Sequence, residues 1–188
     1  MDTRDTRKEI LDLAEDLLLD RGYNGFSYKD ISVALGIKTA SIHYHYPRKT
    51  DLGVEIVQRA IKRFNKWAQL LDNRNLGCSR KLDEFCLLFK GFTSRQQVCL
   101  GGALQTDFKT LPEEIQQMSC ELTSSLLHWL ERLLKEGRDT GAFLFRGEAR
   151  DQAVLIMSSL QGSVQMDRVT AKSSYRSAVR QITLSISP

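Results

Sequence analysis

The chain has no apolar run that approaches the roughly 18 residues of a membrane span. It also lacks a signal-peptide pattern, a glycine-rich phosphate loop, a recognisable Ser, His and Asp arrangement and a His-x-x-x-His metal pair. These absences predict a protein that is not an enzyme and that needs no cofactor and no membrane. The four cysteines lack metal-ligand spacing and stand in apolar helical surroundings, which favours a reduced, cytoplasmic protein; they are Cys78, Cys86, Cys99 and Cys120.

The chain also lacks a large excess of charge of either sign. The 188 residues have a net charge of +4, and residues 1–52 carry 8 Lys and Arg against 9 Asp and Glu, a net of −1. Bulk charge therefore does not argue for a nucleic-acid partner, and any such argument must come from local placement. The hydrophobic content of 41% and the charged content of 27% are ordinary for a globular protein.

Residues 27–50 have the pattern of a helix-turn-helix. Ser27 is a good N-cap, and Asp30, three residues later, gives an approximate capping box. Gly36 stands where the chain must leave the first of two short helices, in a left-handed conformation that glycine adopts without steric cost. Apolar side chains are spaced to lock the two helices together: Ile31, Leu35, Ile37 and Ile42.

The same run has an unusual local charge. Between Ile31 and Thr50 there is no acidic residue, whereas Lys38, Arg48 and Lys49 are basic. A surface that meets phosphate groups has this character. In a helix-turn-helix the second helix lies in the major groove of DNA, with its N-terminal side chains against base edges.

Nearly every other segment has helical rather than alternating periodicity. We expect a first helix over Thr3–Asp20, a long fourth helix that starts at a Thr50–Asp51 cap, and a break at Asn73–Gly77. Pro112 and the two acids after it favour the start of another helix, which is expected to stop at Gly137. The other expected helices cover about 80–92, 100–108, 148–169 and 173–185. The prediction is an all-α fold of about nine helices, three small and N-terminal and six larger.

The run from Thr6 to Leu52 resembles the N-terminal domain of the TetR/AcrR family of bacterial transcriptional repressors. The resemblance keeps one register without gaps and lies in four segments: Thr6–Ala14, Arg21–Ser27, Asp30–Ile37 and Tyr44–Leu52. It implies a helix-turn-helix DNA-binding domain over residues 1–50. Residues 51–188 would then form a helical domain that binds a ligand and dimerises.

The resemblance also implies which side chains contact operator DNA. Those expected at base edges or adjacent phosphates are Lys38, Thr39, Ala40, Ser41, His43, Tyr44, His45 and Lys49. Ser27, Tyr28 and Lys29, at the start of the preceding helix, would touch the DNA backbone. The hydroxyl and methyl groups of Thr39 can meet several bases, whereas a phosphate contact, as expected of Lys49, sets the register without reading sequence.

Two positions depart from the family's pattern. Lys38 stands where a serine usually begins the recognition helix, so we expect Thr39 to cap that helix instead. His43 stands where the family usually has tyrosine, and two interpretations stay open: a base contact, or a side chain that packs or points to water. His45 has the same alternative to its phosphate contact. Tyr46 is expected in the core beneath the turn.

Small residues interrupt one of the two C-terminal helices: Ser158, Ser159, Gly162 and Ser163. A glycine inside a helix costs about 1 kcal/mol relative to alanine, and close approach of another helix is the expected compensation. The resemblance implies that the two C-terminal helices pair with their copies in a homodimer, which would read two half-sites about 34–36 Å apart. The alternative is that these residues serve internal packing only.

The resemblance further implies a cavity for a small molecule among the larger helices. The candidate lining residues are aromatic or apolar, with one amide: Phe64, Trp67, Phe85, Phe89, Phe92, Leu104, Phe108, Met118, Leu122, Trp129 and Gln161. Such a cavity would suit a hydrophobic or aromatic inducer. The alternative for each residue is an ordinary place in the core.

Cys99 precedes Leu100 at the expected start of a helix. The helix dipole would raise the thiolate fraction there, and the resemblance extends to relatives in which a cysteine near this position reacts with electrophiles or oxidants. The alternative is a buried, inert cysteine.

These observations predict a ligand-responsive transcriptional repressor that binds a pseudo-palindromic operator as a dimer and is released by a small-molecule inducer. The alternative is a helical ligand-binding or thiol-based sensor with a degenerate DNA-binding head. The acid-free basic run argues against that alternative, because a head without a phosphate partner has no need of such a surface.

Overall fold

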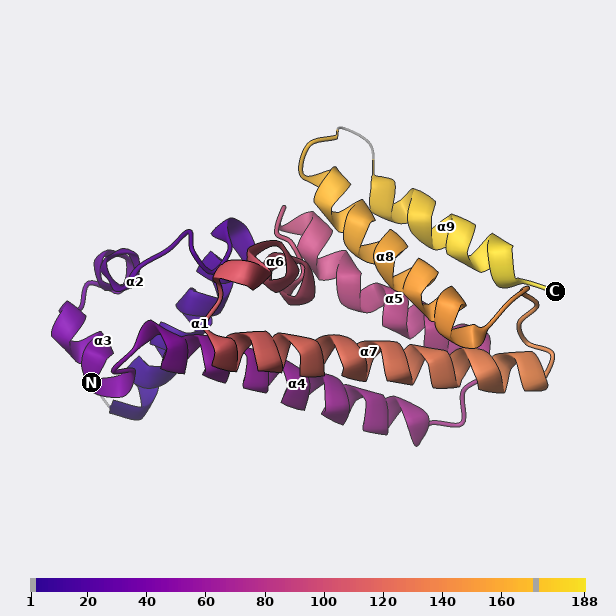
Figure 1. The fold of residues 1–188 in the computed structure, drawn as a ribbon, viewed down its shortest axis with the longest axis horizontal. Coiled ribbons are helices and arrows are strands. Elements are labelled where there is room, and N and C mark those ends of the chain that lie inside the picture. Colours follow the sequence, from indigo (N-terminus) through magenta and orange to yellow (C-terminus); the bar gives the residue numbers. More distant parts are fainter. Residues whose placement is uncertain (1–2, 171–172) are drawn as a thin grey trace. The chain divides into compact units, whose positions relative to one another are not determined.

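The computed structural model describes residues 3–170 and 173–188, and all regular structure within these ranges is helical (Figure 1). The predicted all-α fold is confirmed. The first four helices are α1 Thr3–Arg21, α2 Tyr28–Leu35, α3 Thr39–His45 and α4 Lys49–Asp72. They are followed by α5 Cys78–Ser94, α6 Leu100–Asp107, the short 3₁₀ helix η1 Phe108–Thr110, α7 Glu113–Asp139, α8 Ala149–Asp167 and α9 Ser174–Ile186.

The described chain forms two compact units. The first contains the residues up to Lys62 together with Leu100–Leu122, and the second contains Arg63–Cys99 and Thr123–Pro188. The helix-turn-helix therefore shares its unit with α6, η1 and the start of α7. The two-domain boundary at residue 50 stays a prediction.

The core of the first unit joins α1 to the helix-turn-helix. Ile10, Ala14 and Leu18, spaced four residues apart on α1, are fully buried and form one face of the helix. Ile31 of α2 and Ile42 of α3 are also fully buried, and α1 packs on both helices. Full burial of such side chains is worth about 1.5–3 kcal/mol each, which fixes the positions of α2 and α3.

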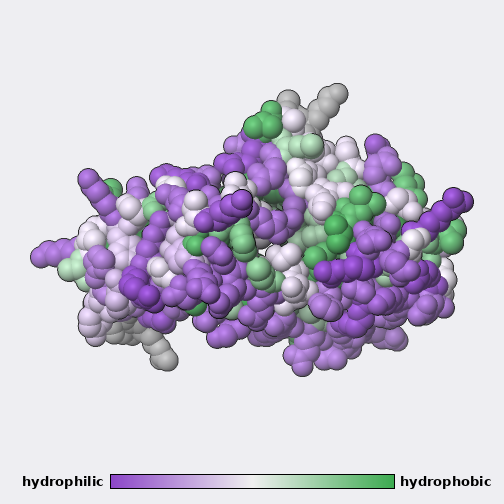
Figure 2. All heavy atoms as spheres, in the orientation of Figure 1, coloured by the Kyte–Doolittle hydropathy of each residue, from purple (hydrophilic) through white to green (hydrophobic). Residues whose placement is uncertain are grey.

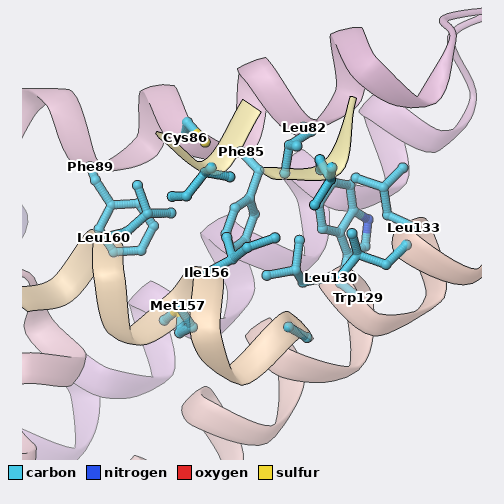
Figure 3. Close-up of a cluster of buried hydrophobic side chains, with 14 of the residues drawn as sticks. Leu82, Phe85, Cys86, Phe89, Trp129, Leu130, Leu133, Ile156, Met157 and Leu160 are labelled. Atoms are coloured by element: carbon cyan, nitrogen blue, oxygen red, sulfur yellow. The ribbon is translucent and has the colours of Figure 1, made fainter. Parts of the chain in front are cut away.

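The core of the second unit lies among α5, α7 and α8 (Figure 3). Phe85 and Phe89 of α5 lie beside Ile156 and Leu160 of α8, and Leu82 of α5 lies toward Trp129 and Leu133 of α7. Four aromatic rings form one side of this core, with centroid distances between 5.0 and 6.5 Å: Phe64, Trp67, Phe85 and Trp129. In Figure 1, α8 and α9 lie side by side, and the Tyr175 hydroxyl of α9 donates to the Cys86 carbonyl at 2.9 Å.

Most helix ends lie within two residues of the prediction, but two boundaries that were assigned to particular residues have a different cause. Helix α4 begins at Lys49, and Asp51 lies in its first turn, where its carboxylate accepts the Arg48 backbone N–H at 2.9 Å. Helix α7 continues past Gly137 to Asp139. A Cβ at Gly137 would lie 2.0 Å from the Phe143 ring, so this glycine gives the ring room and does not end the helix.

The surface is mostly hydrophilic on the face that Figure 2 shows, and apolar side chains gather there over the region of α8. Val154, Leu155 and Met166 of α8 are exposed. No helix within the described ranges combines the length and the apolar character that crossing a membrane requires.

Candidate functional site

The turn between α2 and α3 has the geometry that its glycine predicts. Gly36 has a φ of 65°, in the left-handed region, and its backbone N–H donates to the carbonyls of Ser32 and Val33. The Ser32 hydroxyl donates to the Ile37 carbonyl at 2.7 Å, which ties the end of α2 to the residue after the turn. These bonds hold α3 at a defined angle to α2.

The start of α2 is held by Ser27 and Asp30. The backbone N–H of Ser27 donates to Asp30 Oδ2 at 2.7 Å, and the Ser27 hydroxyl donates to the same oxygen at 2.6 Å. These two bonds lower the pKa of the Asp30 carboxyl. The Asp30 carboxylate therefore caps the start of α2.

Helix α3 presents a polar, acid-free face. Lys38, Thr39 and Ala40 are exposed, and His43 lies one turn further on the same face, four residues from Thr39. Lys38 occupies the N-cap position and no side chain caps it, while Thr39 is already the first residue of the helix. The expectation that Thr39 caps α3 was therefore wrong.

His43 is exposed but held at one end of its ring. Its Nδ1 lies 3.2 Å from the Pro47 carbonyl oxygen, and its ring stands edge-to-face on Tyr28, with centroids 4.8 Å apart. The ring therefore packs on one side, as one interpretation held, and faces the surface of α3 as well. Whether it contacts a base stays a prediction.

The end of α3 carries an aromatic pair. Tyr44 is 78% exposed, and its ring meets His45 edge-to-face at 5.1 Å. Tyr46, the next residue, is only 1% exposed, which confirms its predicted place in the core. Ser41 is half-buried, with a backbone N–H that donates to the Lys38 carbonyl at 2.9 Å.

Tyr28 and Lys49 were expected to contact DNA, but both side chains face inward. Tyr28 is buried, and its hydroxyl donates to the Tyr46 carbonyl at 2.8 Å. The Lys49 ammonium donates to the carbonyls of Tyr23, at 2.6 Å, and Phe26. It also lies 4.6 and 4.2 Å from the centres of those two rings. Burial lowers the pKa of Lys49.

The positive charge of the site comes from fewer residues than the sequence suggests. Arg48 pairs with Asp51 at 2.6 Å and lies 3.7 Å from Glu114 of α7. With Lys49 also engaged, the exposed cations at the start of the two short helices are Lys38 and Lys29.

A contact far along the chain supports the loop before α2. The Asn24 backbone N–H donates to Asp107 Oδ2 at 3.3 Å, and its side-chain amide donates to the Thr110 hydroxyl at 2.7 Å. No local sequence signal predicts this contact, because the partners are more than 80 residues apart. Ser27 and Lys29, on the other side of the loop, are exposed as expected.

The predicted ligand-lining residues divide between the two units. All eleven are at least half-buried. Four belong to the first unit, namely Leu104, Phe108, Met118 and Leu122, and seven to the second, namely Phe64, Trp67, Phe85, Phe89, Phe92, Trp129 and Gln161. Their burial agrees equally with a cavity wall and with an ordinary core.

Within the second unit an open hollow of about 730 Å³ lies between α4 and α7. Phe64 and Trp129 line it, and His128, Asp72 and Arg132 lie around them. Asp72 and Arg132 form an ion pair at 2.6 Å. Two buried donors in this unit have no hydrogen-bond partner, the indole N–H of Trp129 and the amide nitrogen of Gln161.

Cys99 directly precedes α6, as expected, and it is buried. Burial favours the inert interpretation, because a sensor thiol must be accessible. Among the described residues no three His, Cys, Asp or Glu side chains are grouped to hold a metal ion.

Comparison with known proteins identifies the family. The family model described as "Bacterial regulatory proteins, tetR family" matches residues 10–56. A TetR transcriptional regulator of known structure from Legionella pneumophila is 30% identical, with 94% of each chain covered and a TM-score of 0.83. The chain belongs to the TetR family. A TetR-family regulator from Agrobacterium tumefaciens is 26% identical over the whole of both chains, with a TM-score of 0.93.

Curated relatives of this TetR-family chain include transcriptional repressors. The HTH-type transcriptional repressor DhaR from a Mycobacterium species is 22% identical over 161 residues, which is 84% of this chain and 80% of DhaR. The chain is thus a DNA-binding transcriptional regulator, and the comparisons support a ligand-responsive repressor. The comparisons do not support the alternative, a ligand-binding or thiol-based sensor with a degenerate DNA-binding head, better than they support a repressor.

Proposed function

We propose that this TetR-family chain represses transcription as a homodimer that binds a pseudo-palindromic operator and leaves it when a small molecule binds. Residues 1–50 bind DNA, and residues 51–188 dimerise and bind the inducer, in the cytoplasm. The observation that carries the proposal is helix α3, which is exposed and acid-free and is held by the Gly36 turn.

In this proposal α3 enters the major groove. Thr39 and Ala40 face base edges, and Ser41 follows them on the same helix. Lys38 and Lys29 contact phosphates, and their exposed ammonium groups supply the charge that neutralises the DNA backbone.

Two residues near the end of α3 extend this interface. Tyr44, which is exposed, and His45, which is half-buried, set the register through polar contacts with phosphates. The Ser27 hydroxyl gives its proton to Asp30 and caps α2. Tyr28 and Lys49 act from within the domain, where Tyr28 supports His43 and Lys49 holds the loop before α2.

The open space around Gly162 is an argument for a dimer interface formed by α8 and α9. A Cβ added at Gly162 would meet no described atom within 4 Å, so nothing described within the chain compensates for the cost of about 1 kcal/mol of a mid-helix glycine. A hollow of about 420 Å³ beside it is lined by Ser159, Met166 and Ser177. A helix of a second copy would fill this hollow and approach the glycine closely.

A matched pair of variants tests the dimer. Gly91 on α5 also has no described atom within 4 Å of an added Cβ, but it lies outside the proposed interface. We expect Gly162→Leu to sediment as a monomer and to lose operator binding, while Gly91→Leu remains a dimer like the wild type. A dimeric Gly162→Leu protein would contradict the interface.

The inducer is proposed to be a hydrophobic or aromatic molecule with hydrogen-bond acceptors. The aromatic rings around Trp129 provide apolar contact, and the unpartnered donors of Trp129 and Gln161 would be satisfied by acceptor atoms of the ligand. The His128 ring, at the surface of the α4–α7 hollow, then lies near the ligand's path into the unit.

The salt dependence of DNA binding tests the central proposal. Each phosphate contact contributes a slope of about −0.9 to a plot of log affinity against log salt. We expect steep weakening for the wild type and a slope shallower by about 1.8 for Lys38→Ala, because each bound dimer loses two phosphate contacts. Lys90→Ala, which removes an exposed charge from α5, should keep the wild-type slope. A protein without salt-dependent DNA binding would contradict the proposal.

A further inference from the structure

We propose that His43 is a specificity-determining residue that reads the amino group of an adenine or a cytosine through its Nε2 atom. The inference rests on the proposed function, because it requires α3 to lie in the major groove. It goes further by assigning a chemical class of base to one side chain.

The bond to Pro47 determines which ring nitrogen carries the proton. A carbonyl oxygen can only accept, so a hydrogen bond between Nδ1 of His43 and the Pro47 carbonyl, at 3.2 Å, requires a proton on Nδ1. In the neutral ring the proton is then absent from Nε2. This atom has a lone pair and acts as a hydrogen-bond acceptor.

The ring is held in this orientation from a second side. The edge-to-face contact with Tyr28 lies at 4.8 Å, and Tyr28 is itself buried and anchored by its bond to the Tyr46 carbonyl at 2.8 Å. A 180° flip of the ring would put the carbon Cδ2 in the place of Nδ1 and break the bond to Pro47. No hydrogen bond to Nε2 is formed by any described residue, so this atom is available to DNA.

The position on the helix directs this acceptor to base edges. Thr39, Ala40 and His43 share one exposed face of α3. Among the groups that bases present in the major groove, the adenine N6 and cytosine N4 amino groups donate, whereas guanine N7 and O6 and thymine O4 only accept. The Thr39 hydroxyl can donate or accept and so tolerates either class. The His43 acceptor pairs with an amino group and is repelled by the acceptors.

Two substitutions distinguish the contribution of the His43 ring from that of its Nε2 atom. His43→Phe keeps a ring against Tyr28 but has no nitrogen. His43→Asn keeps a donor for the Pro47 carbonyl but ends short of the Nε2 position. In selections from random duplex DNA, we expect both variants to retain the wild-type motif except at one base pair of each half-site. Discrimination at that pair should fall about fivefold to tenfold, as expected for one hydrogen bond.

Base analogues then test the bond itself. At that base pair, purine in place of adenine, or 2-pyrimidinone in place of cytosine, deletes only the amino group. Binding by the wild type should weaken about fivefold to tenfold, and binding by the two variants should not change, which isolates the pair as a double-mutant cycle. Nitrogen NMR of the free protein should show the His43 proton on Nδ1.

The outcomes separate this inference from the proposed function. A symmetric operator that wild type and both variants select identically, or wild-type binding that does not respond to loss of the amino group, would overturn the role of His43 and leave the repressor intact. A ring protonated on Nε2 would also overturn it. Failure of the wild type to select any motif would remove both claims.

Discussion

The replacement Lys49→Met tests whether this lysine holds the fold or holds DNA. Methionine keeps an unbranched side chain of similar length but removes the ammonium group. The group donates to the carbonyls of Tyr23 and Phe26 and lies over both of their rings. The variant therefore leaves two carbonyls without their donor and two rings without their cation.

The expected loss is about 2 kcal/mol in the free energy of unfolding. Two hydrogen bonds from a charged donor are worth about 1.5–3 kcal/mol each, and each cation–π contact adds about 0.5–1 kcal/mol at a partly exposed site. The cost of burying the ammonium opposes them, and it is visible in the lowered pKa of Lys49. Water that enters the part-buried site of the variant reduces the loss further.

Urea unfolding at pH 7, followed by circular dichroism, measures this loss. With a denaturant dependence of about 2 kcal/mol per molar urea, the midpoint should fall by about 1 M. Lys62→Met, which removes an exposed ammonium from the same helix, should move it little. The salt slope of operator binding should stay unchanged in Lys49→Met. Unchanged stability with a slope reduced by about 1.8, for two contacts in each dimer, would show that Lys49 is a phosphate contact and refute the reasoning.

Three further substitutions have defined outcomes. Gly137→Ala should lower the free energy of unfolding by about 1–3 kcal/mol, because its Cβ would overlap the Phe143 ring; a gain in a urea titration, as helix propensity alone predicts, would be inconsistent with this packing. Burial raises the pKa of Tyr175 to about 12, so its stabilising contribution is complete below pH 10, where the unfolded tyrosine ionises, and is lost as the pH rises toward 12. The stability difference between wild type and Tyr175→Phe should therefore shrink over that range, and a constant difference would exclude the effect. Thr39→Ala should change the base preference at one operator position in a binding selection, whereas a uniform loss of affinity would place Thr39 on a phosphate.

Local patterns were sufficient to predict most of the fold. The left-handed Gly36 and the bonds between Ser27 and Asp30 follow from residues within a few positions of each other. Helix periodicity predicted the break at Asn73–Gly77, which lies between α4 and α5. Gly137 was misread as a helix end, because its role depends on a ring from the loop after the helix.

The roles within the site were less predictable, because they depend on atoms distant in sequence. Lys49 has the charge of a phosphate contact, but its partners are carbonyls more than 20 residues earlier. Arg48 is partly neutralised by Glu114 of α7. The His43 tautomer follows from a backbone oxygen whose position no side-chain pattern reveals. Charge and spacing therefore identify the face of α3, but not the function of each side chain on it.

Selection of random duplex DNA on the purified protein tests the central claim most directly. At low salt and without added ligand, the account predicts retention of a two-fold symmetric motif whose half-sites lie about 10 base pairs apart, or a multiple of that, as a dimeric helix-turn-helix protein requires. Retention of no motif under these conditions would contradict a sequence-specific repressor and leave a ligand-binding protein with a degenerate head.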